Sequence, residues 1–440
     1  MEEDLKQTVL SAIKPNEIEH EEFTKVALKL LRKIKKTAKL LDIICSPYIG
    51  GSFGKGTYLK GSSDVDIFMR FDKSYDDSKL SIFLEKILVD SKIKYKKQKG
   101  SRDYFSGSFG PRDYKIEFEL VPNRFVVKKS EAVNSTDLSP LHVEFLKLKE
   151  KDNVNLTDEI RLAKQFFKAK GLYGAESYIG GFSGHVIDIL IMSYGSLENL
   201  INEAKTWESQ KYIDINCVYK DFDEAAGVLG DDKNSSLVII DPIISDRNAA
   251  RALSEENYAR FLLVCNRLSS LDLEDFTIVK REFSEVMESH KVFCKSNNLK
   301  SVMYKLTFSV KGESEDIVGS KLKKLHRKLL TYFTSLDFKV FNDEFFIDIK
   351  QGVCLFCFDF EKSVLPNVKV LKGPKTYMTN AIVSFLKDRE SQYFIKEDRI
   401  CIYDKRRITD LSQVIKFDKE ELQKMLSKNI DFVKGVRLYK

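Results

Sequence analysis

The sequence has no apolar run that approaches the length needed to cross a membrane, and its acidic, polar first residues lack the pattern of a signal peptide. Cysteine is sparse as well: the seven cysteines are an odd number and are scattered along 440 residues. Unpaired, scattered cysteines suit the reducing cytosol rather than an oxidising compartment. We therefore expect a cytoplasmic protein that makes no contact with a membrane.

A complete cysteine zinc motif is also absent. Cys354 and Cys357 form a Cys-x-x-Cys, but no second pair exists to complete a four-ligand site. The pair lies in an apolar run between Gly352 and Asp359 that is typical of a strand, where residues three apart point to opposite faces. We expect both cysteines to be core residues.

Two common phosphate-binding motifs are missing too. The glycine-rich stretch 51–56 is not a Walker A loop, because Lys55 is followed by Gly56 and position 49 is not glycine. It also lacks the glycine spacing of the Rossmann dinucleotide-binding loop. No repeat or low-complexity segment is present.

Residues 51–71, GSFGKGTYLKGSSDVDIFMRF, contain the most informative pattern. Asp64 and Asp66 point to the same face of a predicted strand, while Val65 and Ile67 face a core. Two such carboxylates repel each other unless a cation lies between them, and Mg²⁺ accepts one or two carboxylates together with phosphate and water. A glycine-rich turn upstream can hold phosphate through backbone N–H groups. Either half alone is usually a turn or a solvated strand edge, but together they predict phosphoryl or nucleotidyl transfer.

The first 140 residues predict a mixed sheet with helices. The expected elements are helices within 1–44 and over 78–90, strands over 64–71 and 115–121, and a Gly/Ser/Pro-rich loop over 100–113 flanked by strands. In the strand 115–121, Ile116, Phe118 and Leu120 alternate with Glu117 and Glu119, which share the opposite face. Pro122 is expected to end this strand.

The rest of the chain divides into two further regions. Residues 141–270 have helical periodicity, including a segment 157–170 ended by Gly171 and an apolar helix 186–194 that we expect to be buried on all sides. Residues 271–440 contain a β-α-β-β pattern at about 302–362, an order resembling RRM domains, although the RNP aromatic motif is absent. A chain of this length has room for two to four domains.

Basic residues gather in runs although the net charge is only +7. The runs are 25–39, 92–102 and 321–328, with a further patch at 405–407. Clustered lysine and arginine fit a polyanionic partner. For any single run a solvated helix face is the ordinary interpretation, and we expect it for at least one of them.

The signature Gly51-Ser52, Lys55-Gly56-Thr57 and Ser63-Asp64-Val65-Asp66 resembles that of the polymerase-beta-like nucleotidyltransferases. Over most of its length the chain is similar to the archaeal (class I) CCA-adding enzymes within that superfamily. The further matching segments are Leu120-Val121-Pro122, Gly171–Glu176, Gly181–Gly184, Tyr194-Gly195-Ser196, and Asp241-Pro242 followed by Arg247-Asn248. The C-terminal third matches only loosely.

This resemblance implies an α+β multidomain fold. Its parts are a nucleotidyltransferase head at 1–140, a helical central nucleotide-binding domain at 141–270 and a C-terminal tRNA-binding body at 271–440. It implies template-independent addition and repair of the 3′-terminal CCA of tRNA from CTP and ATP, with two Mg²⁺ ions and one site for both nucleotides. It leaves open whether the enzyme is a homodimer.

The resemblance also implies roles for individual residues. Asp64 and Asp66 match the metal-binding carboxylates, and two metals require a third carboxylate. Chain order and the following Leu-Val-Pro favour Glu119, where the family often has Asp, with Glu117 as the competing candidate.

Further residues match positions that contact the nucleotide. Ser52 and its turn would hold the triphosphate beside Lys55, which stands where the family usually has arginine and lacks the bidentate fork. His142 matches a histidine on the triphosphate side, and Lys164 and Tyr173 match groups near the triphosphate and sugar. Arg247 matches an arginine that supports the incoming base with the RNA backbone. Taken alone, His142 is more typical of a structural position, Lys164 of a helix surface and Tyr173 of a packed core. For Arg247 a nucleotide contact and a charge pair at a helix start are about equally typical.

Two other functions are consistent with parts of the sequence. A poly(A) polymerase or an oligoadenylate synthetase would carry the same head signature, and only the central segments favour the tRNA enzyme. A non-catalytic RNA-binding protein with a degenerate head is the other alternative, but the intact Asp64, Asp66 and acidic third strand argue against it.

Overall fold

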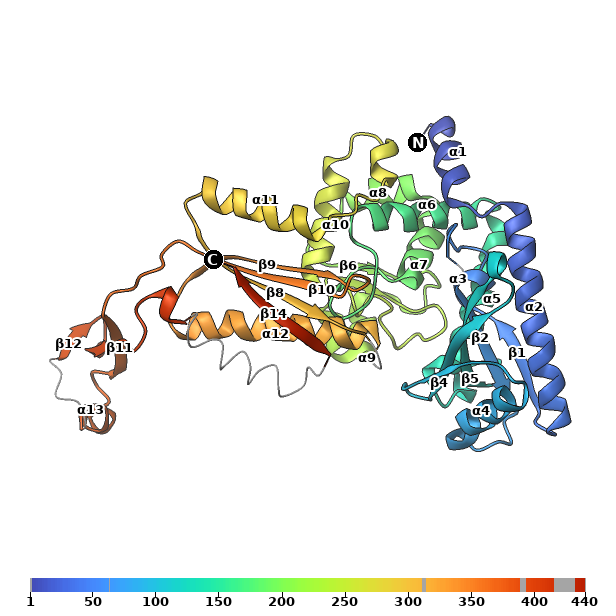
Figure 1. Ribbon diagram of the computed structural model, residues 1–440, viewed down its shortest axis with the longest axis horizontal. Coiled ribbons are helices and arrows are strands. Elements are labelled where there is room, and N and C mark those ends of the chain that lie inside the picture. The colour runs from blue at the N-terminus through green and yellow to red at the C-terminus, as the bar shows by residue number, and fades with distance from the viewer. Residues whose placement is uncertain (1, 63, 311–313, 388–392, 415–431, 440) are drawn as a thin grey trace. The chain divides into compact units, whose positions relative to one another are not determined.

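The computed structural model describes residues 2–62, 64–310, 314–387, 393–414 and 432–439 (Figure 1). The chain divides into two compact units, Met1–Val279 and Lys280–Lys440. Among the described helices, none is both long and apolar enough to span a bilayer. The domain boundaries proposed from the sequence stay predictions.

The first unit begins with a five-stranded mixed sheet. Its strands, in spatial order, are β1 (Cys45–Ile49), β2 (Asp64–Phe71), β5 (Ile116–Arg124), β4 (Tyr104–Phe109) and β3 (Lys96–Gln98). β2 and β5 are parallel, and the other neighbours are antiparallel. The parallel pair is the centre of the sheet and places two acidic strands side by side.

One face of this sheet is covered by α2 (Glu17–Leu40) and α4 (Leu80–Asp90) (Figure 1). Asn16 caps α2 by accepting a hydrogen bond from the Glu19 N–H, which satisfies one of the free donors of the first turn. The apolar residues of both helices and the inward residues of the strands form one core, which includes Leu30, Ile34, Ile67, Leu84 and Phe118. The opposite face of the sheet is therefore free to carry polar side chains.

Two details of the head differ from the sequence prediction. The predicted loop over 100–113 was wrong at 104–109, because those residues form β4. Gly107 makes the pairing possible, since a Cβ there would lie 2.6 Å from the Lys94 carbonyl oxygen and 2.7 Å from the Phe118 ring. A glycine that signals a loop in sequence can also mark the close approach of two strands.

Pro122 was expected to end β5, and this was wrong as well, because the strand continues to Arg124. β4 pairs with β5 only as far as Leu120, so Pro122 has a strand neighbour, Met69 of β2, on one side only. Its carbonyl accepts from the Arg102 guanidinium at 3.1 Å. A proline is tolerated where its missing N–H faces no neighbouring strand.

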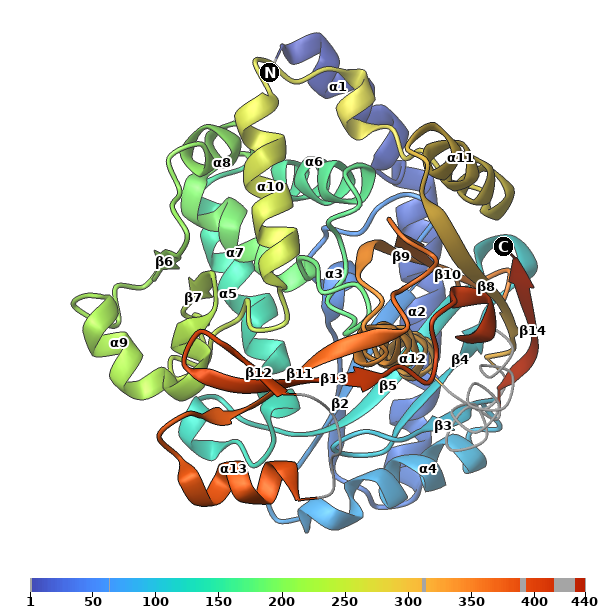
Figure 2. The ribbon, with the colours of Figure 1, turned by 90° about the vertical axis from the view of Figure 1, so that its left-hand side faces the viewer.

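The rest of the first unit is mainly helical (Figure 2). Its helices are α1 (Glu3–Ile13), α5 (Ser139–Asp152), α6 (Leu156–Ala169), α7 (Gly184–Tyr194), α8 (Leu197–Ala204), α9 (Phe222–Leu229) and α10 (Glu255–Arg267), with a short parallel pair β6 (Lys211–Ile213) and β7 (Leu237–Ile239). Phe167, Phe182 and Phe261 pack ring against ring at the centre. The predicted apolar helix is α7, and its residues Val186 to Ile191 are buried as expected. Burial on all sides was wrong for 192–194, which are only half-buried.

The second unit contains a four-stranded antiparallel sheet in the order β14 (Val433–Tyr439), β8 (Lys300–Phe308), β10 (Val353–Phe360) and β9 (Val340–Asp348). α11 (Phe283–Ser296) covers one face and α12 (Glu315–Ser335) the other (Figure 1). The predicted β-α-β-β order is present as β8, α12, β9 and β10. Cys354 and Cys357 are fully buried on opposite faces of β10, as predicted.

A smaller three-stranded sheet also belongs to this unit. It consists of β11 (Val368–Lys375), β13 (Arg399–Lys405) and β12 (Tyr393–Lys396), with α13 (Thr379–Leu386) packed against β11.

The basic run 92–102 ends in a buried arginine that is engaged inside the fold. Arg102 pairs with both oxygens of Asp137, which is fully buried, and with Asp77. Replacing Arg102 with alanine leaves a buried carboxylate without its partner, so we expect a loss of about 3–5 kcal/mol in the free energy of unfolding. Denaturant unfolding of the full chain measures this loss.

The matched control is Lys99→Ala in the same basic run, whose side chain is 90% exposed. We expect this variant to stay within about 0.5 kcal/mol of the parent protein. Equal stability of the two variants would contradict a structural role for Arg102.

Candidate active site

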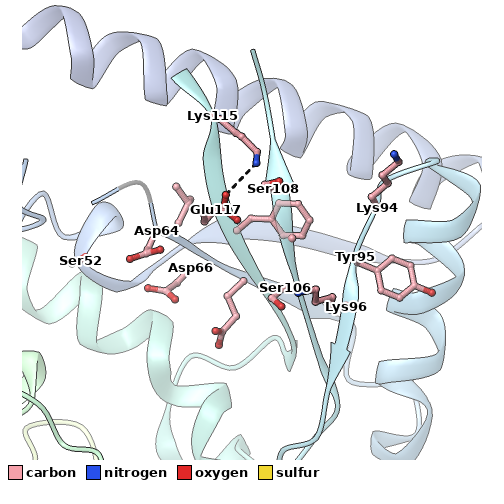
Figure 3. Close-up of a pocket in the computed structure, with 14 residues that line it drawn as sticks. Ser52, Asp64, Asp66, Lys94, Tyr95, Lys96, Ser106, Ser108, Lys115 and Glu117 are labelled. Atoms are coloured by element: carbon pink, nitrogen blue, oxygen red, sulfur yellow. Dashed lines mark ion pairs between the residues drawn. The ribbon is translucent and has the colours of Figure 1, made fainter. Parts of the chain in front are cut away.

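The parallel pairing of β2 and β5 creates an acidic face. Asp64 lies opposite Glu117, and Asp66 lies opposite Glu119. These four carboxylates and Ser52 line a cleft of about 740 Å³ (Figure 3). The strand period predicted this face, because alternate residues of each strand point to the same side.

The glycine turn lies directly against this face. Gly51 begins the short helix α3 (Gly51–Gly54) with φ of +54°, and a Cβ there would lie 1.5 Å from Oδ2 of Asp66. The Gly50 N–H donates to the Asp66 carbonyl oxygen at 2.8 Å and so holds the turn onto β2. Only glycine allows this approach, and it brings Ser52 into the cleft beside the carboxylates.

The carboxylates of the acidic face repel one another. Burial, followed by the charges of Asp66 and Asp64, raises the pKa of Glu119 to about 7. Burial and the Asp64 charge also raise the pKa of Asp66. Within the described part of the chain, none of these three carboxylates forms an ion pair, so their negative charge is unbalanced. An all-oxygen donor set of this kind fits a hard divalent cation.

Glu117 and Glu119 differ in their surroundings. Glu117 is exposed and its Oε1 lies 3.5 Å from Nζ of Lys115, outside the group formed by Asp64 and Asp66 (Figure 3). Glu119 is more buried and pairs in register with Asp66 on one side and Ser106 on the other. This geometry favours Glu119 as the third carboxylate.

Lys55 and Lys164 meet at one buried aspartate, Asp188 of α7. Nζ of Lys55 donates to Oδ2 of Asp188 at 2.8 Å, and Nζ of Lys164 lies 3.2 Å from Oδ1. All three side chains are nearly inaccessible. Lys164 also donates to the Thr57 hydroxyl at 2.8 Å. We call this group the Asp188 triad.

α6 holds the backbone of the signature loop as well. Arg161 donates through its guanidinium to the carbonyl oxygens of Gly56 and Tyr58. Together with Lys164 on Thr57, this fixes the three residues that follow Lys55. The helical part thereby sets the conformation of residues 56–58 of the signature loop.

Tyr173 lies beside the Asp188 triad. Its hydroxyl is 3.1 Å from the position of a Cβ on Gly184, the first residue of α7. Burial, together with the charges of Asp188 and Glu176, raises its pKa to about 12. The phenol is therefore a neutral donor at the pH of the cell.

A second buried aspartate, Asp241, gathers three other side chains. Its Oδ1 lies 2.7 Å from Nε2 of His142, its Oδ2 lies 3.1 Å from Nε2 of His185, and Arg247 reaches Oδ2 at 3.9 Å. Burial opposes ionisation of Asp241, but the hydrogen bonds with His142 and His185 lower its pKa overall. Burial lowers the pKa of His185.

Arg247 is about half exposed and lines a second cleft of about 680 Å³ together with His185 and Ser183. The structure therefore places the residues predicted to bind nucleotide in three connected groups: the acidic face with Ser52, the Asp188 triad with Tyr173, and the Asp241 group. The charge of Lys55 acts on Asp66 in the first group and on His185 in the third.

Asp188, His185 and Arg161 were not identified from the sequence. For Asp188 one signal was available, because it is the only charged residue in the apolar run 186–194, and a buried carboxylate requires a partner. For His185 and Arg161 the sequence contained no comparable signal.

Three family models match the chain. The model described as "Nucleotidyltransferase domain" matches residues 28–124, "tRNA nucleotidyltransferase, second domain" matches 158–277, and "CCA-adding enzyme, C-terminal domain" matches 300–434.

Similar curated proteins are called CCA-adding enzymes. One from Nanoarchaeum equitans is 30% identical over 414 residues, which cover 92% of this chain and 96% of the relative. Another, from Methanococcus maripaludis strain C7, is 29% identical over 424 residues, covering 93% of this chain and 89% of the relative. Among solved structures, a cytoplasmic RNA terminal U-transferase superposes with a TM-score of 0.50 at 14% identity, over 64% of this chain and all of that one. The predicted fold class is confirmed.

The repulsion within the acidic face predicts a pH effect on stability in the absence of divalent cations. Between pH 4.5, the ordinary pKa of glutamate, and about pH 7, folded Glu119 binds a proton that the unfolded chain has released. Stability therefore falls as the pH rises through this window, and Glu119→Gln removes the contribution of Glu119 to that fall. With a chelator above pH 7, we expect the variant to be more stable than the parent, by at most about 3 kcal/mol before solvent screening.

Thermal unfolding across pH 4–8 measures this difference, which should vanish below pH 4.5 where the parent carboxyl is also protonated. The matched control is Glu117→Gln on the same strand, which should show no such gain. A Glu119→Gln variant that is no more stable than the parent above pH 7 would show that the repulsion is absent.

Proposed function

The chain belongs to the CCA-adding enzymes, a family of tRNA nucleotidyltransferases, and from this membership we propose that it builds and repairs the 3′-terminal CCA of tRNA. It takes CTP and ATP as substrates and uses no nucleic-acid template. The observation that carries the proposal is the parallel β2–β5 pair, which brings Asp64, Asp66 and Glu119 together under the Ser52 turn.

In each addition the oxygen of the RNA 3′-hydroxyl forms a bond to the α-phosphorus of the nucleotide. The bond from that phosphorus to the oxygen bridging to the β-phosphate breaks, pyrophosphate leaves, and the hydroxyl proton passes to solvent. Asp64, Asp66 and Glu119 would hold the divalent cations, which we propose are two Mg²⁺ ions. Bound there, such ions lower the pKa of an attacking hydroxyl and stabilise the charge of the leaving pyrophosphate.

The triphosphate would lie between the acidic face and the Asp188 triad. Ser52 and the backbone of its turn supply donors on one side, and Lys55 and Lys164 supply positive charge on the other. Because Asp188 already binds both ammonium groups, the two lysines are held in place before the substrate arrives. A single ammonium at Lys55 fits this shared carboxylate without the fork of an arginine.

The sugar and base would lie toward Tyr173 and Arg247, with His142 on the triphosphate side. Asp241 orients the imidazole of His142 and keeps Arg247 at the edge of the second cleft. An arginine that is half exposed there can donate to a base or to RNA phosphate. Without a template, such contacts must distinguish the incoming base.

The tRNA itself would be bound mainly through its phosphates, as duplex RNA usually is. The basic runs of the second unit, 321–328 and 405–407, provide the charge for this contact. We propose that the protein acts in the cytoplasm.

The activity is tested with tRNA that ends before the first C of CCA, supplied with Mg²⁺ and with CTP and ATP singly and together. We expect two C residues from CTP alone, and C-C-A with both nucleotides. A long A tail would identify a poly(A) polymerase instead. The absence of incorporation by folded protein that still binds tRNA would identify a binding protein.

Two glutamates on one strand give a matched pair of variants for the catalytic role. Glu119→Gln removes a proposed cation ligand, so we expect kcat for addition to fall at least about 100-fold. Glu117→Gln should stay within about threefold, because its carboxylate pairs with Lys115. Primer extension measures both, and the reverse order would assign the third carboxylate to Glu117. Asp64→Ala with Asp66→Ala should abolish addition while tRNA binding is retained.

Asp188 gives a second test, of how the triphosphate is bound. Asp188→Asn leaves two buried ammonium groups without their counter-charge, so we expect a loss of about 3–5 kcal/mol in stability. A bound triphosphate would restore that charge. CTP without divalent cations should therefore raise the unfolding temperature more in Asp188→Asn than in the parent protein.

The control is Glu203→Gln, an exposed acid of α8, which should respond to CTP as the parent does. An equal response of Asp188→Asn and the parent would place the triphosphate away from Lys55 and Lys164.

A further inference from the structure

The second unit contains a buried group of metal-ligating side chains far in sequence from the active-site residues. His290 and Cys294 are four residues apart on α11, so they lie on the same face of that helix. That face packs on the sheet, where Ser301 of β8 and Asp359 of β10 lie beneath it. His290, Cys294 and Asp359 are each at most 6% exposed.

The donor atoms are spaced like the corners of a zinc tetrahedron. Nε2 of His290 lies 3.0 Å from Oδ1 of Asp359 and 3.5 Å from Sγ of Cys294, and Sγ lies 3.3 Å from Oδ1. Zinc bonds of about 2.0–2.3 Å at tetrahedral angles place such atoms roughly 3.3–3.6 Å apart. The three atoms therefore need only a small outward shift to hold one ion.

A fourth oxygen completes the set. Oγ of Ser301 lies 3.1 Å from Nε2 of His290. The fourth coordination position of an ion can be taken by the Ser301 hydroxyl or by a water molecule. The protein donors are then one nitrogen, one sulfur and one carboxylate oxygen, a combination that suits zinc better than Mg²⁺.

The residues around the donors have the arrangement that supports metal ligands. Oε2 of Glu344 lies 3.3 Å from Nδ1 of His290, so it can accept the Nδ1–H and leave Nε2 unprotonated for a metal. Nδ2 of Asn342 donates to the other oxygen of Asp359 at 3.1 Å. Both ligand orientations are thereby fixed from β9.

We propose that His290, Cys294 and Asp359 bind one Zn²⁺ ion that fastens α11 to the sheet of the second unit. The thiolate and the carboxylate balance the charge of the ion, so the buried group becomes neutral. The competing arrangement has no metal. In it His290 is a protonated imidazolium, and its two ring N–H groups donate to Asp359 and Glu344. Cys294 has no charged role in that arrangement.

Cobalt distinguishes the two arrangements, because Co²⁺ occupies zinc sites and its bond to a thiolate absorbs strongly in the near ultraviolet. The full-length protein is stripped with a chelator and titrated with Co²⁺ alone. We expect one equivalent to produce thiolate-to-cobalt and tetrahedral d–d bands, and Zn²⁺ to remove them. The proposed catalytic cations cannot produce these bands, since their site contains only oxygen ligands.

Cys294→Ala should lose the near-ultraviolet band, and the matched control Cys354→Ala, another buried cysteine of the same unit, should keep it. Glu344→Gln leaves the three ligands in place and should weaken Zn²⁺ binding about 10–100-fold. Folded parent protein that shows no thiolate band with Co²⁺ would overturn the proposal and assign the group to a buried ion pair. A band that survives Cys294→Ala would overturn it as well. Neither readout depends on nucleotide addition.

Discussion

The buried carboxylate of Asp188 is the interaction on which the rest of the candidate active site depends. It binds the ammonium groups of Lys55, in the signature loop, and Lys164, on α6, where little solvent can reach either partner. It acts together with Arg161 of α6, whose guanidinium donates to the carbonyl oxygens of Gly56 and Tyr58 in the same loop. A charge buried without its partner costs several kcal/mol, so the contact fixes the loop and α6 in one relative position. We propose that the same lysines bind the triphosphate.

The acidic face shows the opposite electrostatic situation. Its carboxylates are close together and unbalanced, and burial raises the pKa of Glu119 and Asp66. Such a face lowers the stability of the fold on its own, and divalent cations relieve the repulsion when they bind. Gly51 allows the glycine turn to lie directly against this face. Any side chain at position 51 would clash with Asp66 and push the turn away from it. The head therefore gives up stability at the place where we propose that phosphate and metal ions bind.

The two units of the chain use different donor chemistry for the cations proposed here. The head presents carboxylate oxygens at a cleft, which allows ions and nucleotide to exchange. The second unit encloses a histidine, a cysteine and an aspartate beneath α11, with further side chains that orient them. A closed set with a thiolate suits a structural ion, whereas an open all-oxygen set suits a catalytic one.

Much of this protein was determined by local sequence. The strand period placed Asp64, Asp66 and Glu119 on a polar face, and it also predicted the buried face of β5 and the buried cysteines of β10. Local signals were misleading at two positions. Gly107 lies at a close contact between strands and not in a loop. Pro122 lies beyond the last residue of β5 that pairs with β4, and β5 itself continues. Only the tertiary structure decided the partners of Lys55, His142 and His290, which lie 133, 99 and 69 residues away along the chain. Alternation along a strand follows from backbone geometry alone, but the pairing of buried charges depends on which distant elements pack together, and that is set by the whole core.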